Sequence, residues 1–434
     1  MRSSKGTPSD AVLFTPVLSE LGYASLGYHS AFKGLMPCEH AFRDGFSVET
    51  RRGLCEFEVI YVSIAWELEV LDMARTFERH RIELQSKRRT HGPFVVAGGP
   101  LTLSNPRLLG RVADAVFIGE ADTKFQEIQS ARREAKDKET WLERLAKIEG
   151  MWVPCVHKEV PKPCVAPKDA LPTASFIPHE KNMFSDAFLV EVSRGCPKAC
   201  TFCICRSSNR KTTFVPKEKV LACVPLDRKK VGLLGASVSL HPHLPEILEG
   251  FIARNQKITL SSLRADRIDV EIAKLLRKAG LVTATLGIDG LSERLRCRIR
   301  KDLTKEQVIM AARILKDTGF KGVKVYTMVG LPEETEDDII EGATLLREIA
   351  KFLPLTVSVS PFVPKPRTPL SDARFVGTKE AKQRLSVLER AVRGHARIQT
   401  TSPKTAMLEW RLAHADEDES QSLLQAFIEG KSLI

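Results

Sequence analysis

The sequence predicts an α/β protein in which an N-terminal doubly wound sheet is followed by a series of six β/α units and a small C-terminal extension. Short runs of β-branched and aromatic residues alternate with helix-like stretches, a pattern typical of parallel sheets covered by helices. A proline-rich stretch interrupts the alternation and separates the two series. The 434 residues are enough for two or three domains with sizeable cores.

The composition is that of a globular protein with a basic balance. There are 66 Lys and Arg residues against 54 Asp and Glu, a formal net charge of +12. This charge permits an acidic substrate or nucleic acid, although a solvated basic surface explains it more often. The ten cysteines follow no signal peptide, so we expect free thiols in a reducing compartment. No apolar run reaches membrane-spanning length, and we therefore expect a cytoplasmic protein.

The first third contains the predicted doubly wound domain, over residues 1–140. Four runs have the composition of buried parallel strands: Ala11–Phe14, Glu58–Ser63, Pro93–Ala97 and Ala115–Ile118. Helix-like stretches lie between them at Trp66–Arg81 and Pro106–Val112. Two strands end in glycine turns, Gly98-Gly99-Pro100 and Gly119-Glu120. Open α/β sheets bind their ligands at such turns, because the backbone can approach a ligand closely there.

A linker is expected over residues 141–185. Six prolines with interspersed lysines cannot sustain a helix or a central strand: Pro154, Pro161, Pro163, Pro167, Pro172 and Pro178. Cys155 and Cys164 lie in this stretch without C-x2-C spacing, so we expect neither to bind a metal.

Six β/α units follow over residues 186–375. The expected strands are 187–192, 230–234, 258–262, 282–288, 322–329 and 356–360. The expected helices are 216–224, 244–253, 270–279, 305–318 and 336–352. Catalytic groups of such a parallel array lie at the carboxyl ends of the strands, where the loops converge.

Three cysteines leave the first of these strands with the spacing C-x3-C-x2-C: Cys196, Cys200 and Cys203. Three thiolates can hold three irons of a 4Fe-4S cluster and leave the fourth iron open to another ligand. Zinc is the alternative, with Cys205 as fourth ligand, but no second pair with a matching His lies close by. We expect the cluster on the first three thiols and assign no role to Cys205.

This stretch resembles the signature of the radical SAM superfamily, including Phe202, which packs near adenine in that family. The resemblance implies a partial (β/α)6 TIM-type barrel, a 4Fe-4S cluster and S-adenosylmethionine (SAM) bound to the open iron. It also implies reductive cleavage of SAM to a 5′-deoxyadenosyl radical, which abstracts hydrogen from a substrate that the sequence does not identify. A reductant such as flavodoxin or ferredoxin is implied as partner. No catalytic residue is assigned beyond the cluster.

The resemblance places SAM-binding residues at further strand ends. Gly235 and Ser237 stand where the family has a G-G-E-like segment that binds the SAM amino group, but the acidic residue is missing. Ser262 and Arg264 are expected to hold the SAM carboxylate or ribose, because Arg matches a carboxylate bidentately. An ordinary surface arginine is the alternative for Arg264.

Two more strand ends match family motifs. Asp289 stands where Glu is common and is followed by a basic stretch that reaches Lys301. Gly330-Leu331-Pro332 resembles the G-L-P-x-E-T motif whose backbone and apolar residues contact adenine. The segment 359–370 resembles a cover over the barrel mouth, and we expect Lys365 and Arg367 to face the cavity.

The first domain resembles the cobalamin-binding-type, Rossmann-like domain that precedes many radical SAM domains, through Val95–Pro100 and Asp114–Glu120. The D-x-H-x-x-G signature of cobalamin binding is absent, because none of the histidines has that setting. The domain therefore binds cobalamin without a histidine ligand or keeps only the fold. A cobalamin-dependent radical SAM methyltransferase and a non-enzymatic iron-sulfur binding or sensing protein are the alternative functions.

The C-terminal extension is expected over residues 376–434. It reads as a helix to Arg393, a short strand at Ala396–Thr400 and a helix from Lys404 that leads to an acidic cluster at 416–419. No RNA-binding β-barrel is expected there, which disfavours a tRNA methylthiotransferase.

Overall fold

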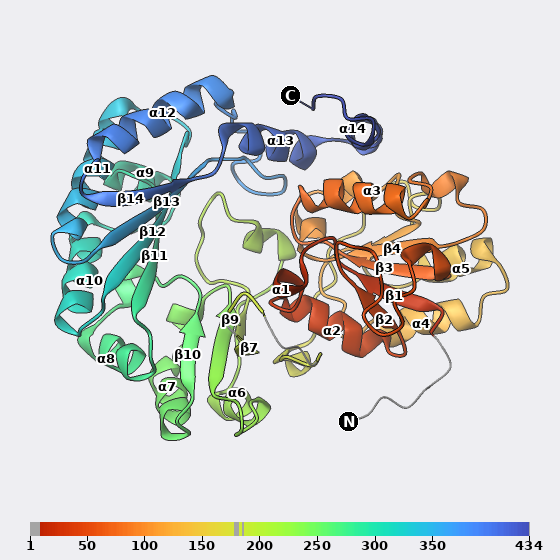
Figure 1. The fold of residues 1–434 in the computed structure, drawn as a ribbon, viewed down its shortest axis with the longest axis horizontal. Coiled ribbons are helices and arrows are strands. Elements are labelled where there is room, and N and C mark those ends of the chain that lie inside the picture. Colours follow the sequence, from red (N-terminus) through yellow and green to blue (C-terminus); the bar gives the residue numbers. More distant parts are fainter. Residues whose placement is uncertain (1–8, 178–181, 185, 434) are drawn as a thin grey trace. The chain divides into compact units, whose positions relative to one another are not determined.

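The computed structural model describes residues 9–177, 182–184 and 186–433 (Figure 1). The chain forms two compact units. The N-terminal unit consists of the described residues up to Asp186 with residues 207–209 and 411–433, and the barrel unit consists of residues 187–206 and 210–410. No helix in the described part of the chain is long and apolar enough to cross a membrane.

The N-terminal unit is built on a six-stranded sheet of order β2-β1-β3-β4-β5-β6. The strands are β1 (Ala11–Phe14), β2 (Glu39–Ala41), β3 (Val59–Ser63), β4 (Phe94–Gly98), β5 (Ala115–Phe117) and β6 (Met151–Trp152). The first five are parallel, and β6 runs antiparallel to β5. The strand order reverses between β1 and β3, so the predicted doubly wound sheet is confirmed.

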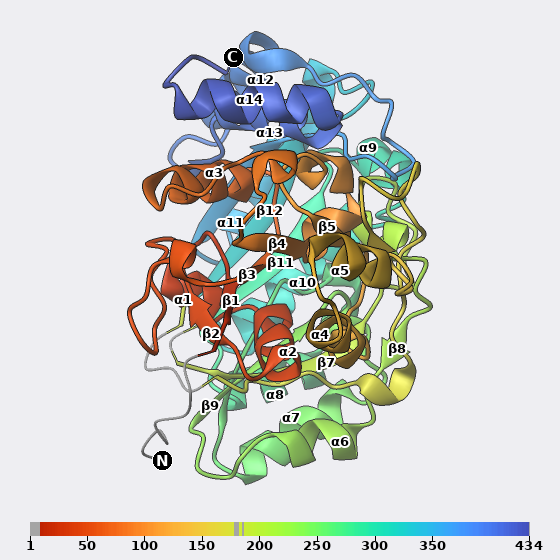
Figure 2. The same ribbon diagram turned by 90° about the vertical axis from the view of Figure 1, so that its right-hand side faces the viewer.

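Helices cover both faces of this sheet (Figures 1 and 2). They are α1 (Ser19–Gly22), α2 (Leu26–Leu35), α3 (Glu69–Arg79), α4 (Phe125–Arg133) and α5 (Lys138–Leu145). On one face α2, α4 and α5 share a core through Phe32, Ile128 and Trp141. The other face carries α3 together with α14 (Glu417–Ile428), which belongs to the C-terminal extension. The expected helix at 106–112 is a short 3-10 turn, Pro106–Leu109.

Salt bridges hold the C-terminal helix α14 against the rest of the N-terminal unit. Arg107 and Arg111 meet Glu417 and Asp418 at 2.8 and 2.6 Å. Asn105 donates a hydrogen bond to the carbonyl of Ala415 at 2.8 Å. The acidic cluster recognised in the sequence thus lies at the N-cap and in the first turn of a helix. Its negative charges interact favourably with the helix dipole there.

The first part of the expected linker forms regular structure in the N-terminal unit. Residues 141–153 contain no proline, and the buried Trp141 and Trp152 lie in α5 and β6. Further on, the chain runs beside the end of β5, where the Cys164 N–H donates to the Ile118 carbonyl at 2.9 Å and the Cys164 carbonyl accepts from Glu120 N–H at 3.0 Å. Domain limits at 140, 185 and 375 stay a prediction.

The barrel unit contains two four-stranded sheets, β10-β9-β7-β8 and β11-β12-β13-β14. The strands are β7 (Phe188–Arg194), β8 (Thr213–Phe214), β9 (Lys230–Gly235), β10 (Lys257–Leu260), β11 (Thr283–Asp289), β12 (Gly322–Val329), β13 (Leu355–Pro361) and β14 (Ala396–Thr400). All pairs are parallel except β7 with β8. A parallel bridge between Leu263 and Leu286 joins the two sheets. The predicted six parallel strands therefore form one curved array, which β14 extends.

Helices lie outside this array (Figure 1). They are α6 (Lys217–Cys223), α7 (Leu244–Ala253), α8 (Val270–Lys278), α9 (Glu293–Arg298), α10 (Lys305–Asp317), α11 (Glu336–Ala350) and α12 (Gly377–Ala391), and α13 (Pro403–His414) follows β14. Side chains of Asp269, Ser292, Thr304 and Thr335 cap the N-termini of α8 to α11. These caps fix where each helix begins, and so they fix the lengths of the loops at the strand ends.

Candidate functional site

The cysteine loop follows β7 directly. Gly195 has a φ of 76°, a left-handed conformation that turns the chain sharply out of the strand. Cys196, Cys200 and Cys203 are all half-buried in the loop. The Thr201 N–H donates to the carbonyl of Ile299 at 3.0 Å, which attaches the loop to the end of α9.

The Cys200 thiol donates a hydrogen bond to the Arg300 carbonyl at 3.6 Å, next to the charged Lys301. Burial raises the pKa of Cys200, whereas Lys301 opposes this rise and Asp289 adds to it. A hydrogen bond with Cys205 lowers the pKa of Cys203 to about 6, and the same hydrogen bond raises that of Cys205. Cys200 and Cys203 therefore lie within electrostatic range of Asp289 and Lys301, although these residues come from a different part of the barrel.

The donor set suits an iron-sulfur cluster. Three half-buried thiols on one short loop are soft ligands of the kind that hold such clusters. No three His, Cys, Asp or Glu side chains of the described ranges are grouped so that they could hold a single metal ion. We identify the cysteine loop as the part of the chain that fits the cluster implied by the sequence.

The end of β11 carries a half-buried ion pair. Asp289 has a left-handed φ of 61°, and its carboxylate lies 2.5 Å from the Lys301 ammonium. Arg264 donates to the Lys301 carbonyl at 2.9 Å and pairs with Asp266 at the same distance. Because Arg264 is only 8% exposed, the alternative of an ordinary surface arginine is wrong.

The predicted residues at the end of β9, Gly235 and Ser237, lie against the backbone at the start of the cysteine loop. The buried Ser237 hydroxyl donates to the Gly195 carbonyl at 3.2 Å, so it already has a partner. A β-carbon on Gly235 would lie 2.6 Å from the Ser193 carbonyl oxygen, which explains why only glycine fits. Ser262, predicted at the end of β10, is exposed.

An apolar cluster packs against Phe202 of the cysteine loop. Buried Leu295, Ile299, Leu331 and Phe362 pack together, and Phe202 and Met328 pack against them. Leu331 is the middle residue of the turn from Gly330 to Pro332, so the structure brings Phe202 and this turn together. A flat aromatic group such as adenine would find apolar contacts there.

The segment after β13 is joined to α13 by an ion pair. Lys365, which is predicted to face the cavity, has its ammonium 2.7 Å from the Glu409 carboxylate of α13, and both side chains are largely buried. The charge of Lys365 is therefore neutralised within the barrel unit. Glu409 could not be identified from sequence, because nothing in the pattern links it to residue 365.

The glycine turns of the N-terminal unit serve the protein's own packing. A β-carbon on Gly99 would lie 2.4 Å from the Ile64 carbonyl oxygen, and one on Gly119 would lie 2.3 Å from that of Cys164. Both glycines have a left-handed φ, 106° and 99°. The backbone approach expected for a ligand is thus used, at these two positions, by neighbouring chain segments.

One histidine has a setting that the sequence did not reveal. His40 Nδ1 lies 2.6 Å from the Glu49 carboxylate and His40 Nε2 lies 3.2 Å from the Tyr23 hydroxyl. His40 lies within β2 rather than in a loop at a strand end, so the absence of a histidine ligand for a corrinoid stays a prediction. Since His40 is buried and both nitrogens have partners, it is not placed as a free ligand.

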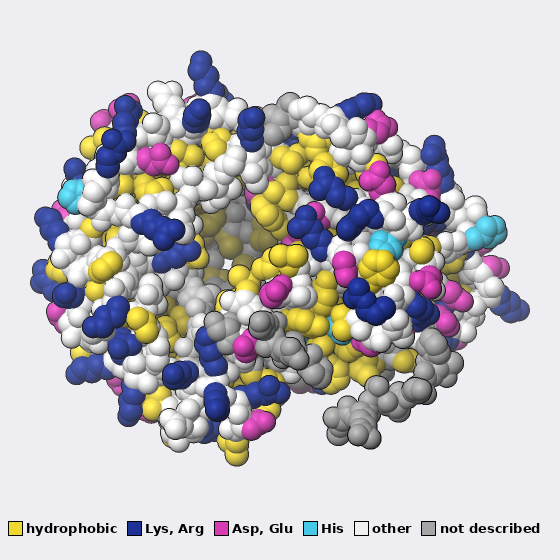
Figure 3. All heavy atoms as spheres, viewed as in Figure 1, with side chains coloured by type: hydrophobic (Ala, Val, Ile, Leu, Met, Phe, Trp, Pro, Cys, Tyr) yellow, Lys and Arg dark blue, Asp and Glu magenta, His cyan; other side chains and the backbone are white. Residues whose placement is uncertain are grey.

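The basic side chains are not gathered on the face of the molecule drawn in Figure 3. Lys and Arg side chains are spread over it, with Asp and Glu side chains between them. This face therefore gives no sign of a continuous nucleic-acid groove.

Comparisons with known proteins agree with the motif. A model of the radical SAM superfamily matches residues 190–346, and a model of radical SAM proteins, N-terminal, matches residues 38–154. An uncharacterized protein of Methanocaldococcus jannaschii is 25% identical over 381 residues, 85% of this chain and 80% of that protein. An uncharacterized methyltransferase of Pyrococcus horikoshii is 25% identical over 279 residues, 61% of this chain and 60% of that protein.

Two solved structures share the fold. The radical SAM methyltransferase TsrM from Kitasatospora setae, with cobalamin and a [4Fe-4S] cluster bound, has a TM-score of 0.64 at 13% identity, over 97% of this chain and 100% of that one. The cobalamin-dependent SAM radical enzyme OxsB, with aqua-cobalamin and SAM bound, has a TM-score of 0.55 at 15% identity, over 98% of this chain and 62% of that one.

Proposed function

We propose that this chain, a radical SAM superfamily enzyme, holds its 4Fe-4S cluster on Cys196, Cys200 and Cys203 and binds SAM between the cysteine loop and the ends of β11 and β12. The observation that carries the proposal is the 3.6 Å hydrogen bond from the Cys200 thiol to the Arg300 carbonyl, because Arg300 precedes Lys301 of the Asp289–Lys301 pair. A bound cluster supplies the electron that splits SAM into methionine and a 5′-deoxyadenosyl radical, which abstracts hydrogen from the substrate.

The charged residues match the polar end of SAM. Lys301 and Arg264 offer positive charge to the SAM carboxylate, and Asp289 offers negative charge to the amino group. Asp289 and Lys301 are each less than one-fifth exposed, so these interactions are weakened little by solvent. The two residues therefore orient the methionine part of SAM.

The apolar cluster matches the other end of SAM. Phe202, Met328 and Leu331 form an apolar surface beside the cysteine loop, and the adenine ring is the apolar part of the cofactor. Binding at both ends would hold SAM in one orientation, which is what a bond cleavage at its sulfur requires.

Spectroscopy of the reduced cluster tests this proposal. Anaerobically reconstituted protein is reduced, and its electron paramagnetic resonance spectrum is recorded with and without SAM. We expect a spectrum that changes when SAM is added, because SAM binds to the open iron. A spectrum that stays the same at saturating SAM would contradict the proposal.

The remaining partners follow from the chemistry. A radical SAM enzyme needs an electron donor. We propose a flavodoxin- or ferredoxin-type donor in the cytoplasm and a substrate that is acidic, in line with the net charge of +12. Mass spectrometry of cell extract incubated with the enzyme, SAM and reductant identifies the substrate through its mass change.

Methyl transfer through cobalamin is a second candidate. The loops after β1 and β3 begin at the point where the strand order reverses, which is where doubly wound sheets bind ligands. Leu18 and Trp66 in these loops are 55% and 40% exposed. An apolar surface of this kind suits the flat face of a corrinoid that has no histidine below it.

A further inference from the structure

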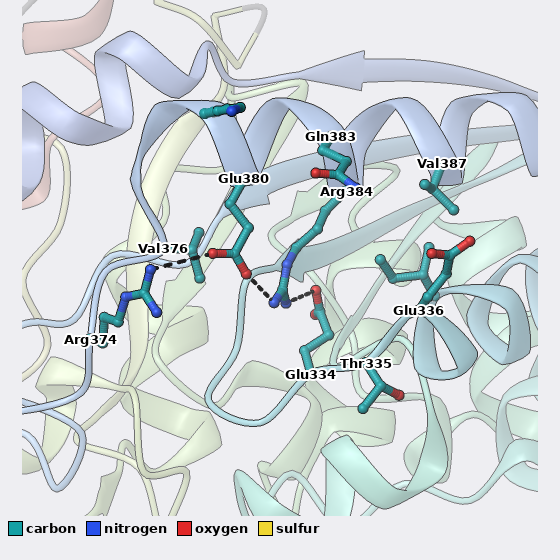
Figure 4. A pocket seen from close by; sticks show the side chains of 11 residues that line it. Glu334, Thr335, Glu336, Arg374, Val376, Glu380, Gln383, Arg384 and Val387 are labelled. Carbon is teal, nitrogen blue, oxygen red and sulfur yellow. Dashed lines mark hydrogen bonds and ion pairs between the residues drawn. The ribbon is translucent and has the colours of Figure 1, made fainter.

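A pocket of about 520 Å³ lies on the outside of the barrel unit, between the first turn of α11 and α12 (Figure 4). Glu334 and Thr335 line it from the α11 side, and Glu380 and Arg384 line it from the α12 side. Figure 4 shows Arg384 reaching from α12 toward Glu334. The pocket thus lies where α12 of the C-terminal extension packs beside α11.

The Glu334 side chain forms a hydrogen bond with the backbone of the turn that follows β12. Its carboxylate Oε1 accepts the Gly330 N–H at 2.8 Å, and its own N–H donates to the Leu331 carbonyl at 3.1 Å. The Glu334 side chain is completely buried. A buried carboxylate that holds a backbone N–H fixes the turn far better than a solvated one, because water does not compete for the hydrogen bond.

Arg384 fastens this turn to α12. Its guanidinium Nη1 lies 2.7 Å from the same Oε1 of Glu334, and its Nη2 pairs with Glu380 one helical turn away. Burial raises the pKa of Glu334, whereas the Gly330 N–H and Arg384 lower it. Arg384 is therefore the cation that keeps a buried carboxylate charged and hydrogen-bonded.

The backbone of the same turn also lies close to the residue that precedes α12. Gly330 has a left-handed φ of 84°, and a β-carbon on it would lie 2.8 Å from a methyl carbon of Val376, the residue before α12. Leu331 in the same turn packs with Phe202 of the cysteine loop in the apolar cluster. A shift of α12 would therefore move the turn and the apolar surface beside the cysteines.

We propose that Glu334 and Arg384 are positioning residues, through which α12 holds the turn from Gly330 to Pro332 in the shape that receives the adenine end of SAM. This inference rests on the proposed function. It adds that a helix of the C-terminal extension, outside the six-strand array, sets the affinity for SAM.

The test compares two arginines that both pair with Glu380. Arg374 lies 3.6 Å from Glu380 and does not pair with Glu334, so Arg374→Ala is the matched control for Arg384→Ala. SAM dissociation constants are measured by equilibrium dialysis on cluster-containing protein, and KM and kcat for SAM cleavage are measured on the same samples. We expect Arg384→Ala to raise the dissociation constant and KM about tenfold with little change in kcat, and Arg374→Ala to change neither.

Chemical rescue separates positioning from a general loss of structure. Millimolar guanidinium can enter the space that Arg384→Ala opens beside the pocket and pair with Glu334 again. We expect it to restore SAM affinity in this variant, whereas neutral urea at the same concentration does not. Arg384→Lys, which keeps the charge but loses the fork of the guanidinium, is expected to lie between the wild type and Arg384→Ala.

The outcomes distinguish this inference from the proposed function. If the wild type binds SAM and Arg384→Ala binds it equally well, or if both alanine variants are weakened alike, the inference is overturned and the proposed function stands. If the cluster-containing wild type fails to bind SAM, both are overturned. Weak binding by Arg384→Ala that guanidinium does not restore would show a structural role only and would also overturn the inference.

Discussion

The Lys301 ammonium lies 2.5 Å from the Asp289 carboxylate, at the end of β11 and within electrostatic range of Cys200. Asp289 reaches this position because it adopts a left-handed φ of 61°, and the Lys301 carbonyl is held by Arg264 at 2.9 Å. Such a conformation costs energy for a residue other than glycine, and it places the carboxylate beside the cysteine loop. We therefore expect the ion pair to be the part of the proposed site on which SAM binding depends most directly.

Replacing these charges is expected to weaken SAM binding. Asp289→Asn and Arg264→Ala should each raise the SAM dissociation constant about tenfold, which corresponds to about 1.4 kcal/mol. The neighbouring Asp302 is exposed, so Asp302→Asn is the matched control and should bind normally. Equilibrium dialysis with labelled SAM measures all three. Near-normal SAM binding by both site variants would show that Asp289 and Arg264 have a purely structural role.

The cysteines are expected to differ in their effect on the cluster. Cys200→Ala should lose the 4Fe-4S cluster, because only two of the three ligands remain. Cys205→Ala should keep it, since Cys205 is expected to hydrogen-bond to Cys203 rather than to hold iron. Iron and sulfide are measured after anaerobic reconstitution. A cluster that survives in Cys200→Ala but is lost in Cys205→Ala would refute the assignment.

Acid stability is expected to depend on Asp338. Burial alone would raise its pKa, but hydrogen bonds from Arg294, Ser292 and Thr335 lower it from 3.8 to about 2. A lowered carboxyl pKa stabilises the folded state above about pH 4, and this contribution is lost as the pH falls toward 2. It amounts to up to about 2 kcal/mol, less the screening at the half-exposed Arg294.

Unfolding of the apo-protein by denaturant measures this contribution. Asp338→Asn should be less stable than the wild type at pH 7, and the difference should shrink between pH 4 and pH 3. Asp337→Asn, at the exposed neighbouring position in the same helical turn, is the control and should match the wild type. A difference that does not depend on pH would show that the charge of Asp338 is not the cause.

The N-terminal unit is expected not to bind a corrinoid through histidine. His40 is buried, with Glu49 on one ring nitrogen and Tyr23 on the other, and His29 accepts the N–H groups of Phe176 and Ile177 at 3.0 Å. Equilibrium dialysis against hydroxocobalamin, followed by a visible spectrum, tests this. Absence of tight binding would support a domain that keeps only the fold. Stoichiometric binding with an imidazole-shifted spectrum would contradict the prediction and would favour methyl transfer as the function of the protein.

Features encoded by neighbouring residues could be predicted from the sequence. Cys196, Cys200 and Cys203 lie on one short loop, so their spacing alone predicts a cluster site there. The buried strands could be recognised because each is a compact apolar run between polar segments. Three strands, β2, β6 and β8, were missed because runs of two or three residues leave no pattern.

Features that depend on tertiary packing could not be predicted. Glu334 and Arg384 are 50 residues apart and meet only because α12 packs beside α11. His40 and Glu49 likewise meet through the fold of the loop after β2. Lys365 pairs with Glu409, which comes from a helix beyond β14. In each case the two partners meet only through the fold, so the sequence pattern does not show that they pair.

Formation of 5′-deoxyadenosine tests the central claim most directly. The reconstituted protein is incubated anaerobically with dithionite and SAM, without substrate, and the products are separated by chromatography and identified by mass. We predict slow formation of 5′-deoxyadenosine by the wild type and by Cys205→Ala, and none by Cys200→Ala. S-adenosylhomocysteine as the only product of the wild type would contradict the claim and indicate polar methyl transfer instead.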